Sequence, residues 1–196
     1  RAGEALLRFV DSHPEITFLI SGGGSACVEV PLSPFFTRDD VRTVNERLIA
    51  AGIPIGEINV VRKHLSAIKG GRLGARVGGR SVSLIYSDVS TGDPGSVASG
   101  LTPPDRSTRE QAIEILRRAG DCDRVVTILR NEDVPETVRT IDNATAFVVA
   151  DNRVLIETAS ALIAERGFRP VPLATQIESD VDAAARLLVD RAATLE

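Results

Sequence analysis

The chain has 196 residues, of which 43% are hydrophobic and 26% charged, enough for a globular domain with a substantial core and too apolar for a disordered one. Its formal net charge of −4 argues against a general nucleic-acid binder, because such proteins carry an excess of basic residues. No run of about 18 apolar residues predicts a membrane span, and the two cysteines are too few for a disulfide scaffold, so we expect a protein of the reducing cytoplasm with no membrane partner.

The predicted elements alternate between apolar runs of strand length and amphipathic stretches of helix length. This alternation predicts an α/β fold in which a mostly parallel sheet is covered by helices on both faces, a three-layer α/β/α sandwich. Thr37 with Asp40, and Thr108 with Gln111, have the spacing of capping boxes at helix starts. In chain order we expect a helix over 3–11, a strand over 16–20, a helix over 38–51, two short helices within 60–80, a strand over 82–86, a helix over 108–119, short helices within 121–141, a strand over 146–150, a helix over 153–166, a proline-containing edge strand over 168–173 and a helix over 181–193.

The first feature of chemical interest is SGGGSA at 21–26, directly after the first expected strand. Three successive glycines let the backbone approach a ligand closely and point several N–H groups one way, an arrangement that favours anions. The alternative is a flexible tight turn, because a lone glycine-rich loop is a weak signal. The pattern is neither the dinucleotide fingerprint GxGxxG nor the Walker sequence that ends in GKS or GKT.

Carboxylates follow the strand at 82–86, in the polar loop 87–100. Asp88 lies just past the strand end, and Asp93 lies further along the loop. Carboxylates at such a place are hard oxygen ligands suited to Mg²⁺ and its phosphate partners, or they accept a hydroxyl proton. Asp93 precedes a proline, so turn chemistry is its alternative role. Because ligands collect beyond the carboxyl ends of parallel strands, we expect the loops after the strands to converge there, and Asp151-Asn152 to cap the next helix or, as the alternative, touch a ribose.

The stretch VVRKHLSAIKGGRLGARVGGR at 60–80 holds Lys63 and Lys69, the only lysines among 23 basic residues. We expect two short helices broken at Gly70-Gly71, with Lys69 and the two glycine amides at the start of the second helix, where an anion could bind. The alternative is a solvated basic face, which a charge run usually forms. All other residues of this basic total are arginines, so the use of lysine at these two positions indicates a specific role.

Other reactive side chains carry less weight. His13 lies in an expected loop and His64 on an expected helix, where a packed or surface histidine is the ordinary case. No Ser/His/Asp triad or metal-spaced histidine set is visible. Cys27 follows SGGGSA without an evident partner, so we expect it to be buried packing.

Four segments in this order resemble the N-terminal domain of the MOFRL-type (class II) glycerate 2-kinases: SGGGSACVEVP, EINVVRKHLSAIKGGRLGARV, SLIYSDVSTGDPGSVASGLTPPD and STREQAIEILRR. The resemblance is dense over about 1–119 and looser to the end. It implies a Rossmann-like domain and ATP-dependent, Mg²⁺-assisted phosphorylation of D-glycerate at its 2-hydroxyl, giving 2-phosphoglycerate. The reaction would take place in a cleft between this domain and a C-terminal MOFRL domain. Residues 1–196 would then be most of one Rossmann-like domain, with its start and the MOFRL domain outside the chain.

Carried over by matching motif, the resemblance implies a set of site residues. Lys69, Lys63 and Asp88 are expected as catalytic groups, with one lysine neutralising charge on the transferring phosphoryl group and Asp88 orienting the 2-hydroxyl. Asp88 and Asp93 are expected to bind Mg²⁺. The expected contacts to nucleotide or glycerate are Ser21, Gly22, Gly23, Gly24, Ser25, Arg62, Gly70 and Gly71.

The chain departs from the family pattern in several places. Ser99-Gly100-Leu101 stands where SGP is usual, a Ser-Thr insertion precedes Gly92, and the family's glycine-rich first strand with its own lysine is missing. The chain also starts without methionine in what reads as the middle of a helix. We therefore expect a fragment whose beginning is missing, with no signal sequence before the first element.

Two other classes of function stay open. A hydroxypyruvate reductase, a label that members of the family have also received, would need a dinucleotide fingerprint with an acidic residue about 20 positions further on, and SGGGSA lacks that spacing. A non-catalytic domain that binds nucleotide or organic acid fits the chain taken alone. A homodimer is an open alternative to a monomer.

Overall fold

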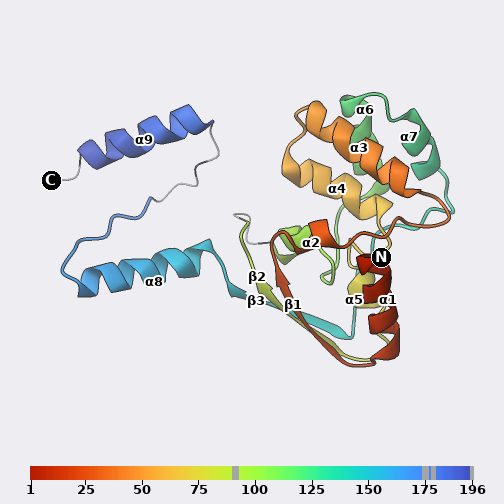
Figure 1. Ribbon diagram of the computed structural model, residues 1–196, viewed down its shortest axis with the longest axis horizontal. Coiled ribbons are helices and arrows are strands. Elements are labelled where there is room, and N and C mark those ends of the chain that lie inside the picture. The colour runs from red at the N-terminus through yellow and green to blue at the C-terminus, as the bar shows by residue number, and fades with distance from the viewer. Residues whose placement is uncertain (90–92, 174–176, 178–179, 195–196) are drawn as a thin grey trace. The chain divides into compact units, whose positions relative to one another are not determined.

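The structure is a computed structural model that describes residues 1–89, 93–173, 177 and 180–194, so the Ser-Thr insertion and Gly92 lie outside the described residues. The chain divides into two compact units, Arg1–Asn152 and Arg153–Glu196. No helix within the described residues is long and apolar enough to cross a membrane. The second unit is formed by two helices, α8 (Asn152–Glu165) and α9 (Val181–Ala193) (Figure 1). The first unit contains, in chain order, α1 (Ala2–Ser12), β1 (Ile16–Ser21), α2 (Gly24–Cys27), α3 (Arg38–Ala50), α4 (Ile55–Leu65), α5 (Arg72–Ala75), β2 (Ser81–Tyr86), the 3-10 helix η1 (Pro94–Ser99), α6 (Arg109–Ala119), α7 (Asp123–Leu129) and β3 (Ala144–Ala150).

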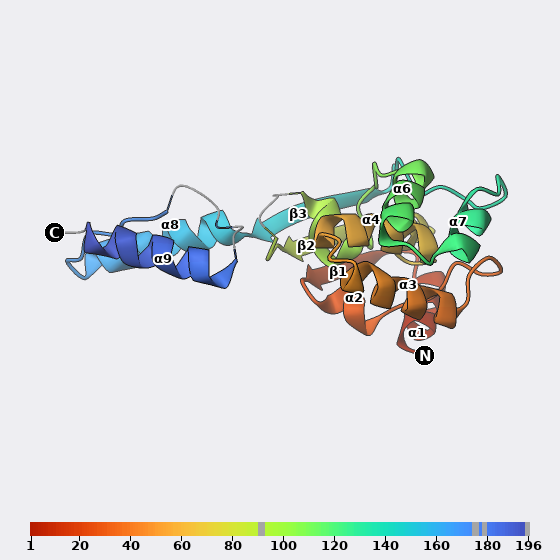
Figure 2. The ribbon, with the colours of Figure 1, turned by 90° about the horizontal axis from the view of Figure 1, so that it is seen from above.

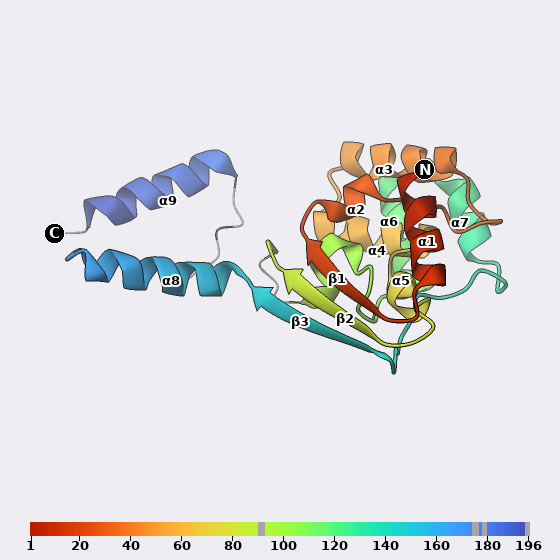
Figure 3. The ribbon, with the colours of Figure 1, turned by 60° about the horizontal axis from the view of Figure 1, so that its bottom comes forward.

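The three strands of the first unit form one parallel sheet in the order β1-β2-β3. Leu19, Leu84 and Phe147 stand side by side in register across it. Figure 3 shows the three arrows pointing the same way, so the carboxyl ends of the strands meet at one edge. The α/β class and the parallel sheet predicted from the alternation of apolar runs are confirmed.

The inner face of the sheet packs against α1, α5 and η1. Period-two alternation along β1 turns Ile16, Phe18 and Ile20 inward. The buried apolar residues of this layer are Val10, Ile20, Ile68, Leu73, Val77, Ile85, Val97, Ala98 and Leu101. Burying one large aliphatic side chain contributes about 1.5–3 kcal/mol, so this layer holds α1 and α5 on one side of the sheet (Figure 3).

The outer face of the sheet, made by the alternate residues of the same strands, carries exposed apolar side chains. Leu19 is 81% exposed and Phe147 is 53% exposed. A sheet that is apolar on both faces is typical of folds in which helices cover each side. The strands therefore have the two apolar faces that a three-layer sandwich requires.

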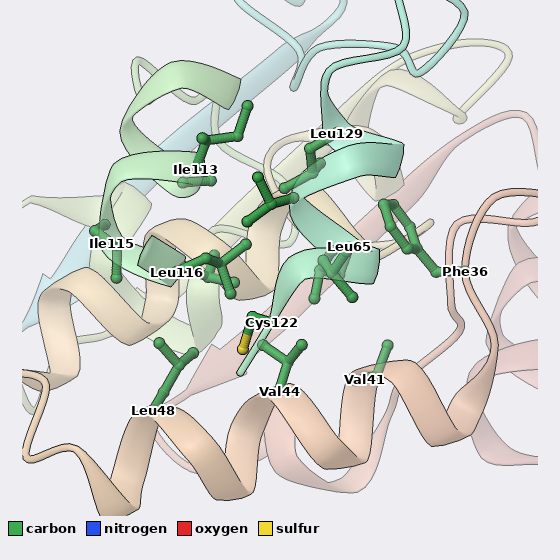
Figure 4. Packing of buried hydrophobic residues seen from close by; sticks show 14 of the residues in the cluster. Phe36, Val41, Val44, Leu48, Leu65, Ile113, Ile115, Leu116, Cys122 and Leu129 are labelled. Carbon is green, nitrogen blue, oxygen red and sulfur yellow. The ribbon is translucent and has the colours of Figure 1, made fainter. Parts of the chain in front are cut away.

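A second hydrophobic cluster lies among the helices of the first unit. Figure 4 shows Val41, Val44 and Leu48 on one side of α3, pointing toward Leu116 and Cys122. Their spacing places them on one helical face, as expected for an amphipathic helix. Helices α4, α6 and α7 supply most of the remaining members, and Figure 2 shows these helices grouped beside α3.

Two helix starts have the capping boxes expected from the sequence. Thr37 Oγ1 accepts a hydrogen bond from the Asp40 N–H at 3.1 Å, and the Asp40 carboxylate accepts one from the Thr37 N–H at 2.8 Å. Thr108 and Gln111 make the same reciprocal pair at α6. Arg124 of α7 also donates to Asp40, and chiefly through this hydrogen bond it lowers the pKa of Asp40 to about 2. The first capping box thus also ties α3 to α7.

The prediction of an edge strand over 168–173 is wrong, because these residues form neither strand nor helix. The Phe168 N–H donates to the Ile163 carbonyl at 3.2 Å, at the end of α8, instead of to a strand. Pro170 and Pro172 have no N–H to donate to a sheet.

In the region 121–141, where short helices were expected, α7 is the one helix among the described residues.

Candidate active site

The candidate site lies at the carboxyl edge of the sheet, where the loops after β1 and β2 leave side by side. Ser21, the last residue of β1, pairs in register with Tyr86 of β2, so the SGGGS loop at 21–25 starts next to residues 87–89. Gly22 lies directly against Asp88, since a Cβ added at Gly22 would be 1.8 Å from the Asp88 Oδ2 atom. The glycine leaves the space that the carboxylate fills. The predicted glycine-rich loop and the predicted strand-end carboxylate therefore meet.

The SGGGS loop leads into a very short helix, α2, of four residues. Gly23 has a φ of +78°, in the left-handed region that glycine adopts without strain. Gly23 and Gly24 are exposed, and a Cβ added at either would meet no atom within 4 Å. Ser21 is exposed and Ser25 is half-buried beside them. The loop presents bare backbone to solvent, as backbone contact with an anion requires.

The two aspartates after β2 have different surroundings. Asp88 is exposed at the site. Asp93 accepts hydrogen bonds from the Gly95 N–H at 3.1 Å and from Ser96 Oγ at 3.0 Å, which makes it the N-cap of η1. Asp93 therefore has the capping role that was its alternative, while Asp88 and Asp93 are both exposed.

A magnesium site here would rest on Asp88 together with groups of the ligand. The described residues contain no group of three or more His, Cys, Asp or Glu side chains that could hold a metal ion. Mg²⁺ in nucleotide-dependent enzymes usually keeps several waters and needs one or two carboxylates plus phosphate oxygens. An exposed Asp88 fits such a shared site, whereas the described residues build no cage made of protein ligands alone.

Both lysines are buried and ion-paired. Lys63 Nζ lies 2.9 Å from Asp105 Oδ1, and the two side chains are 9% and 5% exposed. Lys69 Nζ lies 2.5 Å from Glu29 Oε2, and the Lys69 side chain is 5% exposed. The alternative of a solvated basic face is wrong for these two residues. Each ammonium group is matched by a carboxylate of the chain.

Asp105 has further partners around Lys63. Ser107 Oγ donates to Asp105 Oδ2 at 2.5 Å, and Thr137 Oγ1 donates to the Ser107 carbonyl at 3.3 Å. Burial opposes ionisation of Asp105, but the hydrogen bonds from Ser107 and Lys63 outweigh it and lower the pKa of Asp105. Lys63 therefore ties α4 to the loop before α6 and, through it, to the segment around 137.

Gly70 and Gly71 lie between α4 and α5, the two helices expected in the basic stretch. Both glycines have left-handed φ angles, +61° and +80°. Their N–H groups donate to the carbonyls of Ser99 at 3.4 Å and Gly100 at 2.8 Å. The expectation that these amides bind an anion at a helix start needs correction, because the amides already hold the segment after η1 and α5 has only four residues.

Arg62, an expected ligand contact, is also engaged within the fold. Its Nε atom donates to Asn45 Oδ1 of α3 at 2.6 Å, and burial lowers the pKa of its guanidinium. Arg72 donates to the carbonyls of Lys63 at 2.6 Å and Ser66 at 3.0 Å, at the end of α4, and burial lowers its pKa to about 10. Both arginines hold α4 in place.

The remaining reactive side chains are mostly structural. His64 is fully buried, with Nδ1 2.9 Å from the Val60 carbonyl oxygen and Nε2 3.2 Å from Glu136 Oε2, so it is a packed histidine. Cys27 is exposed at the end of α2, so its expected burial is wrong. It therefore lies near the SGGGS loop as an accessible thiol.

Sequence reasoning missed the two acids that pair with the lysines. Glu29 stands between two valines in ACVEVP, and an acid among apolar neighbours needs a positive partner when it is buried, so this signal was available. Asp105 pairs with a lysine 42 positions away, and nothing in its local sequence indicates that partner.

The fold and the site define a class of protein, an α/β domain with a glycine-rich loop and a carboxylate at the carboxyl edge of a parallel sheet, the edge where such folds bind ligands. Residues 1–131 match the family described as "Domain of unknown function (DUF4147)". The chain belongs to this family, the N-terminal domain of the MOFRL-type glycerate 2-kinases, which confirms the resemblance seen in the sequence.

Similar proteins carry names of glycerate kinases. A glycerate 2-kinase of Sulfurisphaera tokodaii is 32% identical over 92% of this chain and 42% of its own length. A D-glycerate 2-kinase of Thermotoga maritima is 32% identical over 93% of this chain and 44% of its own. The crystal structure of a glycerate kinase from Thermotoga maritima matches with a TM-score of 0.80 and 30% identity, covering 96% of this chain and 46% of that one. The chain therefore spans less than half the length of these relatives.

Proposed function

We propose that the complete protein to which this chain belongs is a glycerate 2-kinase, which transfers a phosphoryl group from ATP to the 2-hydroxyl of D-glycerate and releases 2-phosphoglycerate. The contact between Gly22 and Asp88 carries the proposal, because it joins an anion-accepting loop to an exposed carboxylate at the edge of the sheet. The family and the names of the relatives support glycerate as the substrate. We propose the cleft between this domain and a MOFRL domain as the place of the reaction.

Phosphoryl transfer needs positioned reactants and charge stabilisation more than covalent chemistry from the protein. In the proposed site the exposed N–H groups of Gly23 and Gly24 hold oxygens of a phosphate or of the glycerate carboxylate. Asp88 binds Mg²⁺ together with the phosphates, or it orients the 2-hydroxyl. Mg²⁺, when bound, supplies positive charge to the phosphate oxygens. Lys69 is paired with Glu29, two residues after α2, whereas Lys63 is paired with Asp105 in the loop before α6.

Replacing Asp88 by Asn tests this assignment in the complete protein. The variant keeps the size of the side chain but loses the charge, so we expect kcat to fall by about a hundredfold, the usual scale for a lost acid, base or metal ligand. The concentration of Mg²⁺ for half-maximal rate should rise as well. Steady-state kinetics over a Mg²⁺ series measure both. Wild-type kcat and Mg²⁺ dependence in Asp88→Asn would remove Asp88 from the site.

A hydroxypyruvate reductase is the second candidate, because two relatives from Agrobacterium vitis, 36% and 37% identical, are provisionally named so. The four-residue α2 argues against it, since dinucleotide-binding folds place the pyrophosphate at the start of a full helix after the glycine loop. Incubation of the complete protein with hydroxypyruvate and NADH or NADPH decides between them. Oxidation of the nicotinamide without ADP formation from D-glycerate and ATP would favour the reductase.

We propose further that the protein works in the cytoplasm on small molecules, and that residues 1–196 are most of its Rossmann-like N-terminal domain. The free thiols of Cys27 and Cys122 support a reducing compartment.

Sedimentation of the complete protein shows whether it forms the homodimer left open by the sequence. Tight binding of ATP without turnover of D-glycerate would instead support a non-catalytic binding domain.

A further inference from the structure

We propose that Lys69, Glu29 and Ser66 form a clamp that fixes the exit of the SGGGS loop, and that Lys69 acts on the reaction through this loop without touching a reactant. We call these three residues the exit clamp. The kinetic part of the proposal rests on the proposed kinase function, while its structural part does not.

The exit clamp is a compact set of polar contacts. Glu29 Oε2 accepts from Lys69 Nζ at 2.5 Å, and Glu29 Oε1 accepts from Ser66 Oγ at 2.6 Å and from the Val30 N–H at 2.9 Å. Lys69 and Ser66 are buried, and the Glu29 side chain is 28% exposed. Each carboxylate oxygen therefore has a donor, and the ammonium group has a charged partner, as a stable buried ion pair requires.

Backbone contacts run beside the clamp and join the same two segments. The Ala67 N–H donates to the Val30 carbonyl at 2.7 Å, and the Leu32 N–H donates to the Leu65 carbonyl at 2.9 Å. Pro31 and Ser66 form an antiparallel bridge between these bonds. The segment after α2 is thus attached over several residues to the turn that follows α4, with the Lys69–Glu29 ion pair at one end of the attachment.

The SGGGS loop is held by few polar contacts of its own, although α2 lies beside η1 and Val28 packs against the core. Gly23 and Gly24 are exposed with open space around them, and α2 has no side-chain hydrogen bond at its N-cap. At its start the loop is held by Ser21, the last residue of β1. At its end, Glu29 follows the last residue of α2 by two positions. The exit clamp therefore supplies the second anchor of the loop.

If Lys69 acts by positioning the loop, loss of either partner of the ion pair should lower the catalytic rate to a similar extent. Removing one charge leaves the other without its partner in a poorly solvated place, which destabilises the contact between the segment after α2 and the turn after α4. A lysine that touched a phosphate would behave differently, because Glu29 would then be dispensable. Exchanging the two residues keeps their opposite charges, so it restores the ion pair without a lysine at position 69, although a lysine at position 29 cannot accept from the Val30 N–H.

The kinetic test compares variants of the complete protein. Lys69→Met and Glu29→Gln should each lower kcat/KM for ATP and D-glycerate by about tenfold or more, the scale of a misplaced binding group. The double variant Lys69→Glu with Glu29→Lys should regain about threefold or more over the poorer single variant, since coupled pairs are non-additive. Wild-type kinetics in Glu29→Gln, or a double variant no better than the poorer single variant, would overturn the proposal.

Arg80→Gln is the matched control for loss of an ion pair. Arg80 pairs with Glu15 at 3.8 Å just before β2 and β1, at the edge of the sheet opposite the site, and its side chain is 77% exposed. Because exposed pairs of this kind contribute little to stability, this variant should keep wild-type kinetics. Ser66→Ala is the second variant in case the ion-pair variants do not fold, since it leaves both charges in place. It removes the hydrogen bond to Glu29 and the two longer ones, each 3.3 Å, that Ser66 Oγ accepts from the Ile68 and Lys69 N–H groups.

Hydrogen exchange of backbone amides tests the clamp without reference to activity. In Glu29→Gln and Ser66→Ala the amides of 22–28 should exchange faster than in the wild type, while those of α6 stay unchanged. Wild-type exchange at 22–28 in both variants would overturn the clamp. If the wild-type protein fails to phosphorylate D-glycerate, the proposed function fails, and the exchange result alone decides the clamp.

Discussion

Gly22 determines where the Asp88 carboxylate can lie. The carboxylate occupies the space that any larger residue at position 22 would need, with Asp88 Oδ2 1.8 Å and Asp88 Cγ 2.1 Å from the place of an added Cβ. Since Asp88 is exposed and its side chain can rotate, a larger residue at 22 displaces the carboxylate and leaves the core intact. At this position an effect on activity separates from an effect on stability.

Replacing Gly22 by Ala in the complete protein should therefore lower kcat by about tenfold or more, because a shift of about 1 Å in a catalytic group is costly. The free energy of unfolding should change by less than about 1 kcal/mol, as for other substitutions away from the core. Steady-state kinetics and urea unfolding measure the two quantities. Gly78→Ala, whose added Cβ meets no atom within 4 Å, is the control and should change neither. A Gly22→Ala protein with wild-type kcat would show that the place of Asp88 is unimportant.

Among the elements, the start of α3 shows how one side chain can serve two contacts. Asp40 completes the capping box with Thr37 and also accepts from Arg124 Nε of α7 at 2.9 Å. The hydrogen bond from Arg124 is the main cause of the low pKa of Asp40, about 2. A carboxyl whose pKa is lower in the folded than in the unfolded state stabilises the fold above its unfolded pKa of about 3.9 and loses that contribution as the pH falls through the folded value.

The variant Asp40→Asn should lower the free energy of unfolding by about 1–3 kcal/mol at pH 7, the scale of a helix cap together with a carboxyl whose pKa is lowered to about 2. The difference from the wild type should stay constant down to about pH 4 and then shrink, because the wild-type carboxylate becomes protonated. Urea unfolding over a pH series measures this difference. Asp39→Asn, next to it and 88% exposed, is the control. A difference that stays constant to the lowest pH at which the protein is folded would contradict the role of the charge.

Over the whole molecule, sequence patterns predicted the structural features that are determined by residues close together in the chain. The strands around Ile20, Ile85 and Val148 follow from apolar runs, and the helix starts at Thr37 and Thr108 follow from residues three positions apart. The sheet edge then brings the glycine loop and the strand-end carboxylate together, because parallel strands share one carboxyl edge. These features of fold and site could be predicted.

Contacts between distant segments could not be predicted from such patterns. Lys69 meets Glu29 across 40 positions, and Lys63 meets Asp105 across 42, so the burial of both lysines depends on the tertiary fold. The same holds for Gly70 and Gly71, whose amides donate to the carbonyls of Ser99 and Gly100 at the end of η1. The lysine count correctly argued against a solvated basic face, and the partners that the structure shows are carboxylates of the chain.

The position of the phosphate in the product is the most direct test of the proposed reaction. The complete protein should be incubated with D-glycerate, ATP and Mg²⁺, and the product should be identified by proton-coupled phosphorus NMR, which distinguishes a phosphate on a CH group from one on a CH₂ group. We expect ADP and 2-phosphoglycerate in equal amounts, with formation of both strongly reduced in Asp88→Asn. Formation of 3-phosphoglycerate, or no phosphorylated product at all, would contradict the proposed function.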